Sequence, residues 1–176
     1  MRRFERPNDG RYLTFSCFQR LQLFRNERIR DAFVGALREA RERDRFRLFA
    51  WVVMPEHVHL YVMPAPPGGK VAPSLWRLKR DFAKLVIRRW RRLGAPVLAR
   101  ITDAAGKPHF WLPGGGYDRN IHSDSEHHEK ITYINENPVR RGLVARSIDW
   151  RWSSARWYVG FRDGELGIDP TTPRLG

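Results

Sequence analysis

Residues 46–63, FRLFAWVVMPEHVHLYVM, show the clearest strand pattern in the chain. Residues 46–54 are apolar enough to form a central strand of a sheet, and the proline that follows cannot donate a hydrogen bond to a neighbouring strand, so a short turn is expected there. Residues 57–63 then alternate as a second strand. Because successive strand residues point to opposite faces, His57 and His59 share one face and the valines and leucine between and after them face the core.

The segments on either side supply the rest of the architecture. The expected elements are a strand over 11–19, helices over 26–43 and 74–93, a strand over 117–121 and a helix from Ser123–Ser125 to Asn137. The buried stripe of the second of these helices is expected to include Leu78, Phe82 and Leu85. The last helix is expected to stop before Pro138, since proline disfavours helical geometry in the residue before it. The order strand, helix, strand, strand, helix, strand predicts a ferredoxin-like α+β sandwich with an antiparallel sheet, followed by an additional C-terminal helix.

We expect a single domain over residues 1–159, with a basic arm over 1–10 and a flexible C-terminal tail over 160–176. Three tryptophans lie near the end of the domain, at positions 150, 152 and 157. Stacking on nucleic-acid bases is one role for them, but packing of the chain end onto the core is favoured.

The charge of the chain indicates the class of its partner. Among 176 residues, 33 lysines and arginines stand against 19 acidic residues, for a net charge of +14. Such a field attracts polyanions, nucleic acid first and anionic membrane second. No apolar run approaches the roughly 20 residues of a membrane-spanning helix. The single cysteine excludes an internal disulfide and a cysteine-built zinc site, so the cytoplasm is the expected compartment.

Four residues suggest chemistry. His57 and His59 are a ready pair of ligands for a divalent metal, although two half-exposed strand histidines would have the same spacing. Tyr133 and Asn137 lie four apart and share one face of the last helix. An amide oxygen can complete the ligands, and a tyrosine hydroxyl can act as a covalent nucleophile beside a metal. A lone helical tyrosine more often packs in a core or an interface.

Several motifs resemble one known family. VVMPEHVHLYV (52–62) is similar to the HUH strand of the single-tyrosine transposases, in which a bulky apolar residue separates two histidines. YINENPVRRGLV (133–144), with YDRNI upstream and DWRWSSARWY downstream, resembles their tyrosine helix and tail. The nearest branch is that of the REP-associated tyrosine transposases, and the resemblance covers residues 10–158. Asn135 departs from it, because many relatives have histidine at this position.

The resemblance implies a mechanism. His57, His59 and Asn137 would hold Mg²⁺ or Mn²⁺, and Tyr133 would attack a phosphodiester of single-stranded DNA. The products would be a 5′-phosphotyrosine link and a free 3′-OH, and the reaction could reverse to rejoin strands. The partner would be a DNA hairpin formed by a palindromic repeat, bound by a monomer or homodimer in the cytoplasm at the nucleoid.

Basic residues outside this group are candidates for DNA contacts. Those expected to contact DNA are Arg77, Arg80, Lys84 and Arg88 on the 74–93 helix, Arg119 in the YDRN segment, and Arg140 and Arg141 after the tyrosine. An ordinary solvated helix face explains the first four equally well. The histidines at 122, 127 and 128 are expected to face solvent.

Other readings remain open. The domain could be a sequence-specific hairpin-binding protein, inactive or domesticated, without catalysis. An unrelated metal hydrolase could use the histidine pair with Glu56 as its only nearby acid, but that reading explains neither the charge nor Tyr133. Tyr117 is a rival nucleophile by residue type. It lies in an expected strand and lacks a ligand four residues on, so Tyr133 is preferred.

Overall fold

The computed structural model describes residues 10–64, 70–114, 116–162, 164 and 166–169. The strands are β1 (Gly10–Ser16), β2 (Arg47–Val53), β3 (His57–Met63) and β4 (Tyr117–Ile121). The helices are α1 (Glu27–Asp44), α2 (Val71–Arg92), α3 (Val97–Ile101), α4 (Asp124–Arg140) and α5 (Ala155–Tyr158), with 3-10 turns at Phe18–Arg20 and Ser147–Asp149. The expected basic arm lies outside the described residues, apart from Gly10, which begins β1.

The four strands form one antiparallel sheet in the order β2-β3-β1-β4. This order, with α1 and α2 as the two crossovers, is the ferredoxin-like arrangement expected from the sequence, and the fold prediction is confirmed. The two central strands are β3, which carries the histidines, and β1. Their register sets Thr14 opposite His59 and Ser16 opposite His57. Directly paired residues point to the same face, so both histidines share a face with β1 side chains.

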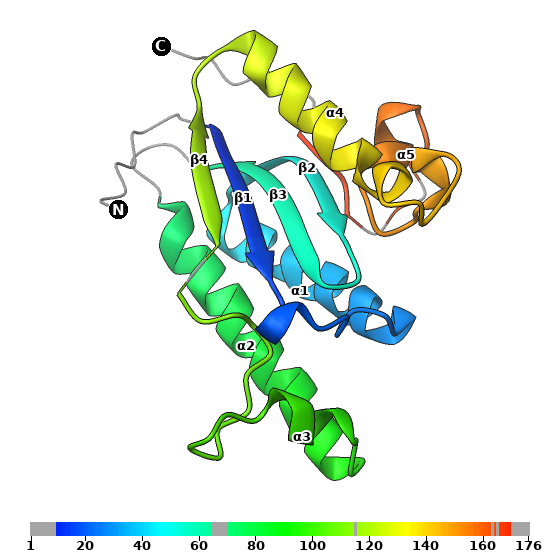
Figure 1. The fold of residues 1–176 in the computed structure, drawn as a ribbon. Helices are drawn as coiled ribbons and strands as arrows, with labels where there is room; N and C mark the ends of the chain where they lie inside the picture. Colours follow the sequence, from blue (N-terminus) through cyan, green and yellow to red (C-terminus); the bar gives the residue numbers. More distant parts are fainter. Residues whose placement is uncertain (1–9, 65–69, 115, 163, 165, 170–176) are drawn as a thin grey trace.

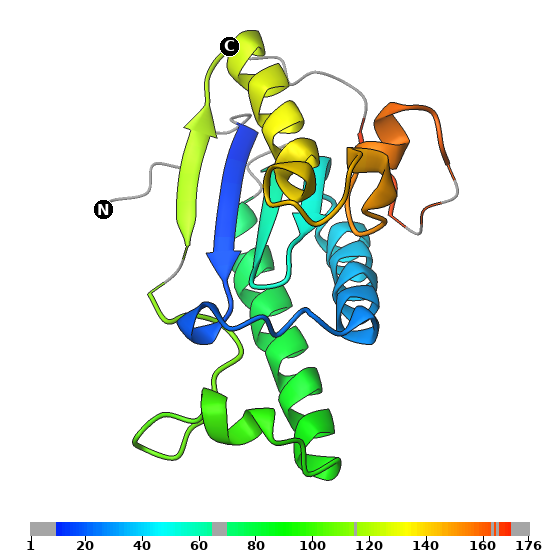
Figure 2. The same cartoon turned by 45° about the vertical axis from the view of Figure 1, so that its right-hand side comes forward.

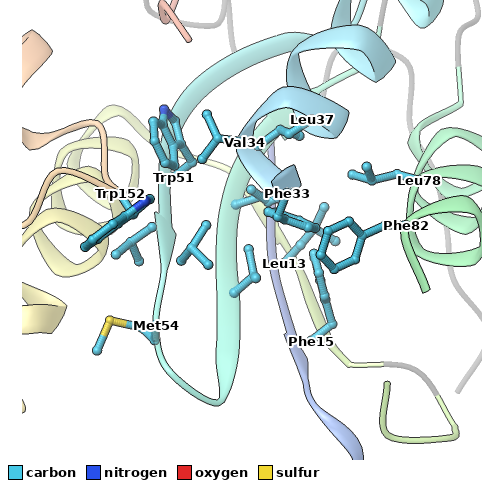
Figure 3. Close-up of a cluster of buried hydrophobic side chains, with 14 of the residues drawn as sticks. Leu13, Phe15, Phe33, Val34, Leu37, Trp51, Met54, Leu78, Phe82 and Trp152 are labelled. Atoms are coloured by element: carbon cyan, nitrogen blue, oxygen red, sulfur yellow. The ribbon is translucent and has the colours of Figure 1, made fainter. Parts of the chain in front are cut away.

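The two faces of the sheet are covered by different helices. In Figures 1 and 2, α1 and α2 lie behind the sheet and α4 lies across its other face. Beneath α1 and α2 is an aromatic core, where the rings of Phe33 and Phe82 meet at a centroid distance of 5.0 Å. Figure 3 shows these two rings beside Leu13 and Phe15 of β1. The core therefore fixes the sheet from one side and leaves the histidine face to α4.

Helix α2 differs from expectation at one position. Leu78 and Phe82 are buried as predicted, whereas Leu85 is 45% exposed. The buried positions continue from Phe82 to Val86 and then to Trp90, a step of four residues that turns Leu85 away from the sheet. The buried face of α2 is therefore narrower than the spacing of its apolar residues predicted.

Helix α4 continues through Pro138 and ends at Arg140, so the prediction that it stops before the proline was wrong. Proline removes one backbone donor, but the turn is closed by later donors: Arg141 N–H donates to Asn137 O at 3.1 Å and Leu143 N–H donates to Pro138 O at 2.9 Å. Gly142, with φ of 66°, allows the chain to leave the helix. As a result Asn137 stays on the helix, one turn beyond Tyr133.

The chain end packs along the edge of β2. Trp150 and Trp152 are buried, as expected, and the Arg30 guanidinium lies 3.6 Å from the Trp152 ring. Within the expected flexible tail, residues 166–169 pack against the rest of the domain. Leu166 and Ile168 are buried and Asp169 N–H donates to Leu48 O at 2.7 Å, because this segment covers apolar surface and an open strand edge. Residues 170–176 lie outside the described part.

Within the described ranges, no helix combines the length and the apolar character needed to cross a lipid bilayer.

Candidate active site

The two histidine rings of β3 approach each other through their Nε2 atoms. His57 Nε2 and His59 Nε2 lie 2.9 Å apart. His59 is buried, with 4% of its surface exposed, and His57 is half-buried. The strand alternation places both rings on one face of the sheet, where their Nε2 atoms meet.

The inner nitrogens are held by neighbouring side chains. His59 Nδ1 lies 2.8 Å from the Tyr12 hydroxyl and 2.7 Å from Thr14 Oγ1. His57 Nδ1 lies 3.1 Å from Glu56 Oε1, which also accepts a hydrogen bond from Arg141 Nη2 at 2.8 Å. The carboxylate can only accept, so Nδ1 of His57 carries the proton and Nε2 presents its lone pair.

The environment keeps this pair uncharged. Burial lowers the pKa of His59 to about 3, with a further lowering from His57. Burial also lowers the pKa of His57, against the opposing influence of the Glu56 carboxylate. Neutral imidazoles are the form that binds metal ions.

Helix α4 brings the tyrosine and the asparagine to the same point. The Asn137 side-chain amide lies 3.3 Å from His59 Nε2, and Asn137 is buried. The Tyr133 ring packs edge-on against His59 at a centroid distance of 5.7 Å and against Tyr12 at 6.1 Å. One helical turn separates Tyr133 from Asn137, and both come from the chain that supplies the histidines.

The donors fit a divalent metal. Two imidazole nitrogens and an amide converge, and a half-turn of the Asn137 amide presents its oxygen in place of its nitrogen. Among the described residues no group of three His, Cys, Asp or Glu side chains could hold a metal. A metal here would depend on the amide and on water or substrate oxygens, a mixed nitrogen and oxygen set suited to Mn²⁺ and tolerated by Mg²⁺.

Comparison with known proteins finds a curated relative and a solved structure that resemble the chain. No protein-family model matches the chain. The REP-associated tyrosine transposase of Escherichia coli strain K12 is 30% identical over 131 residues, which are 73% of this chain and 64% of that protein. The chain is similar to this REP-associated tyrosine transposase. A solved structure of such a transposase bound to a REP hairpin has the same fold, with a TM-score of 0.68 and 21% identity over 100% of this chain and 95% of that one.

The chain therefore spans less than two thirds of this curated relative. The resemblance inferred from the motifs around His57 and Tyr133 is confirmed by the similarity to this relative. The roles of individual residues stay predictions.

Some of the expected DNA-contacting cations lie beside the tyrosine. The Arg140 guanidinium lies 5.1 Å from the centre of the Tyr133 ring, and exposed Arg141 reaches Glu56. Arg119 of β4 points to the same face of the sheet, since its partner in the β1 register is Tyr12, and it pairs with Glu126 in the first turn of α4.

The four candidates on α2 lie on the opposite layer from the histidines (Figure 1). Arg77 pairs with Asp44 at 2.7 Å, and Arg80 pairs with its neighbour Asp81 at 2.7 Å. Lys84 and Arg88 are exposed. The structure therefore does not bring these four residues to the site, and any contact with DNA there would be made by a different part of the substrate.

Several site residues were not predicted from the sequence. Tyr12 and Thr14 have the two-residue spacing of one strand face, but only the β1–β3 register shows that they meet His59. Lys130 gave no signal beyond its position one turn before Tyr133. Tyr117, the rival nucleophile, is 56% exposed and packs edge-on against Tyr12 at 5.9 Å.

One histidine expected in solvent is buried. His127 Nδ1 lies 2.9 Å from the Tyr61 hydroxyl, because the face of α4 that carries it packs on the sheet. Its neighbours His122 and His128 are exposed, as expected. His127 thus anchors the first half of α4 on β3.

Asn135, which departs from the family pattern, anchors the same helix at its other half. It is buried, and its side-chain oxygen accepts a hydrogen bond from Ser154 Oγ at 2.7 Å. Ser154 in turn contacts the backbone of Trp51 on β2. These contacts fix the helix that carries Tyr133 and Asn137.

Proposed function

We propose that the chain nicks and rejoins single-stranded DNA at hairpins, in a metal-dependent reaction with a 5′-phosphotyrosine intermediate. The observation that carries the proposal is the meeting of Tyr133 and Asn137 with His57 and His59, across 78 residues of sequence between Asn137 and His59. Similarity in sequence supports it, since the curated relative is a transposase. The homologous structure bound to a REP hairpin supports the choice of substrate.

Tyr133 is the nucleophile of the proposed reaction. The Tyr133 hydroxyl oxygen attacks phosphorus, the bond from phosphorus to the 3′ oxygen breaks, and the departing 3′ oxygen receives a proton. The new phosphotyrosine diester replaces the old phosphodiester, so the reverse attack by a 3′-OH needs no nucleotide cofactor. Cations beside the tyrosine, such as Arg140, attract the phosphate.

His57, His59 and Asn137 would hold Mg²⁺ or Mn²⁺. When bound, the ion supplies charge neutralisation at the phosphate and polarisation of the leaving oxygen. Glu56 and Thr14 hold the two imidazoles so that Nε2 of each faces the ion site. A protonated tyrosine hydroxyl is a weak nucleophile and so benefits from such electrostatic help near neutral pH.

The test is formation of a covalent adduct. Full-length protein is mixed with labelled single-stranded oligonucleotides carrying the palindromic repeats that flank its gene, in Mn²⁺, Mg²⁺ or EDTA. We expect a denaturant-stable protein–DNA band that requires a divalent metal and is absent from Tyr133→Phe, while Tyr117→Phe still forms it.

The same gel separates the hairpin-binding alternative. Binding of the hairpin with no adduct under any metal condition would overturn the catalytic proposal and leave a binding protein. An adduct that survives in Tyr133→Phe would overturn the choice of nucleophile.

A further inference from the structure

A hollow of about 340 Å³ opens beside the candidate nucleophile. Its walls come from β1, β3, β4 and α4, and the lining residues are Tyr12, Thr14, His59, Tyr117, Lys130 and Tyr133. It shares His59 and Tyr133 with the catalytic group described above. Whatever occupies it therefore lies next to the reacting atoms.

The walls combine aromatic rings with one cation. Tyr117 is 56% exposed and sets its ring at 64° to that of Tyr12. The Lys130 ammonium lies 5.9 Å from the ring centres of both Tyr12 and Tyr133. A helical lysine in an ordinary solvated position keeps most of its side chain in water, but this one is only 14% exposed and pairs on its outer side with Glu129.

This lining fits a nucleotide. A base stacks on an exposed aromatic ring regardless of its identity, and an ammonium beside it binds phosphate. A metal would find a poor site at this end, because the inner nitrogen of His59 is already engaged by Tyr12 and Thr14.

We propose that this hollow is the binding site of the unpaired nucleotide immediately 3′ of the cleaved bond, with its base on Tyr117 and its phosphate near Lys130. The inference rests on the proposed function and extends it to a substrate subsite. In an in-line displacement the leaving 3′ oxygen lies opposite the attacking oxygen, so the upstream nucleotide extends away from Tyr133. The downstream nucleotide stays attached to the phosphorus bound to Tyr133 and therefore remains beside its ring.

The experiment places 2-aminopurine, a base whose fluorescence is quenched by stacking, in the hairpin oligonucleotide. One oligonucleotide carries it immediately 3′ of the cleavage position, and a second carries it immediately 5′. Binding is followed in EDTA, so that no cleavage is needed. The variants are Tyr117→Leu, Tyr117→Phe, Lys130→Gln and Lys130→Arg, with Lys107→Gln as a control for loss of one exposed positive charge elsewhere.

We expect quenching at the 3′ position in wild type, its loss in Tyr117→Leu and its retention in Tyr117→Phe. Loss of the stacking ring should weaken binding about five- to a hundredfold. Lys130→Gln should also weaken binding, more than Lys107→Gln does, and Lys130→Arg should restore most of it.

Two results would overturn the subsite. One is hairpin binding by wild type without quenching at the 3′ position; the other is equal quenching in Tyr117→Leu and wild type. Failure of wild type to bind the hairpin in a gel shift would instead remove the proposed function, and the subsite with it.

Discussion

Glu56 should control the metal affinity of the site although it is not a proposed ligand. Its carboxylate accepts from His57 Nδ1 at 3.1 Å and from Arg141 at 2.8 Å. The side chains of Glu56 and His57 are each only 12% exposed, so water screens their contact weakly. In Glu56→Gln an acceptor oxygen remains, but the negative charge that fixes the imidazole proton and raises the basicity of the other nitrogen is lost.

Changes to such outer partners of a metal-binding histidine cost about 10- to 100-fold in metal affinity, or about 1.4–2.7 kcal/mol. We expect Glu56→Gln to raise the Kd for Mn²⁺ by about tenfold or more. The Kd is measured by titration calorimetry or from the electron paramagnetic resonance signal of free Mn²⁺. The matched control is Arg141→Gln, which keeps the bond between Glu56 and His57.

Arg141 is 57% exposed, so its ion pair with Glu56 is worth little and the control should bind Mn²⁺ nearly as wild type does. His57→Ala marks the level of a lost ligand. If Glu56→Gln binds Mn²⁺ as tightly as wild type while His57→Ala binds it much more weakly, Glu56 does not control the metal affinity.

Two further outcomes concern stability. Burial lowers the pKa of His59 to about 3 from an ordinary 6.5, so below pH 6.5 the unfolded chain takes up a proton that the folded chain does not. The contribution of His59 to the free energy of unfolding is complete above pH 6.5 and is lost as the pH falls toward 3, by about 1.4 kcal/mol per pH unit. Urea unfolding in EDTA should therefore show a smaller drop in unfolding free energy from pH 7 to pH 5 in His59→Gln than in wild type. Equal drops in the two proteins would contradict this. Asn135→Ala removes the nearer of the two acceptors of the buried Ser154 hydroxyl, which still reaches Trp51 O at 3.3 Å, and should cost about 0.5–1.5 kcal/mol of unfolding free energy. Glu129→Gln at an exposed position should cost almost nothing.

The strands and helices could be predicted from local patterns because each depends on nearby residues. The alternation around His57 and His59 and the four-residue spacing of Tyr133 and Asn137 are properties of one strand and one helix. These patterns alone could not predict that the strand and the helix bring the two residue pairs together. That expectation came from the resemblance to the transposase family.

What the sequence could not show depends on contacts between distant segments. Thr14 lies beside His59 because of the register of β1 and β3. Lys130 lines the site because of the way α4 is oriented on the sheet. The packing of Leu166 and Ile168 depends on an open edge of β2 that composition does not reveal. The helix end was predicted too early at Pro138, because backbone donors after the proline close the last turn.

In the proposed reaction, the hydroxyl oxygen of Tyr133 forms a covalent bond to a phosphate of the DNA. Digestion at lysine and arginine releases residues 131–140, ITYINENPVR, whose only tyrosine is Tyr133. The most direct measurement is mass spectrometry of this peptide after reaction with the hairpin oligonucleotide in Mn²⁺ and nuclease trimming. We expect the peptide with a nucleotide attached to Tyr133 through its 5′ phosphate. The nucleotide on the Tyr117 peptide instead, or an unmodified 131–140 peptide from protein that has cleaved the DNA, would contradict it.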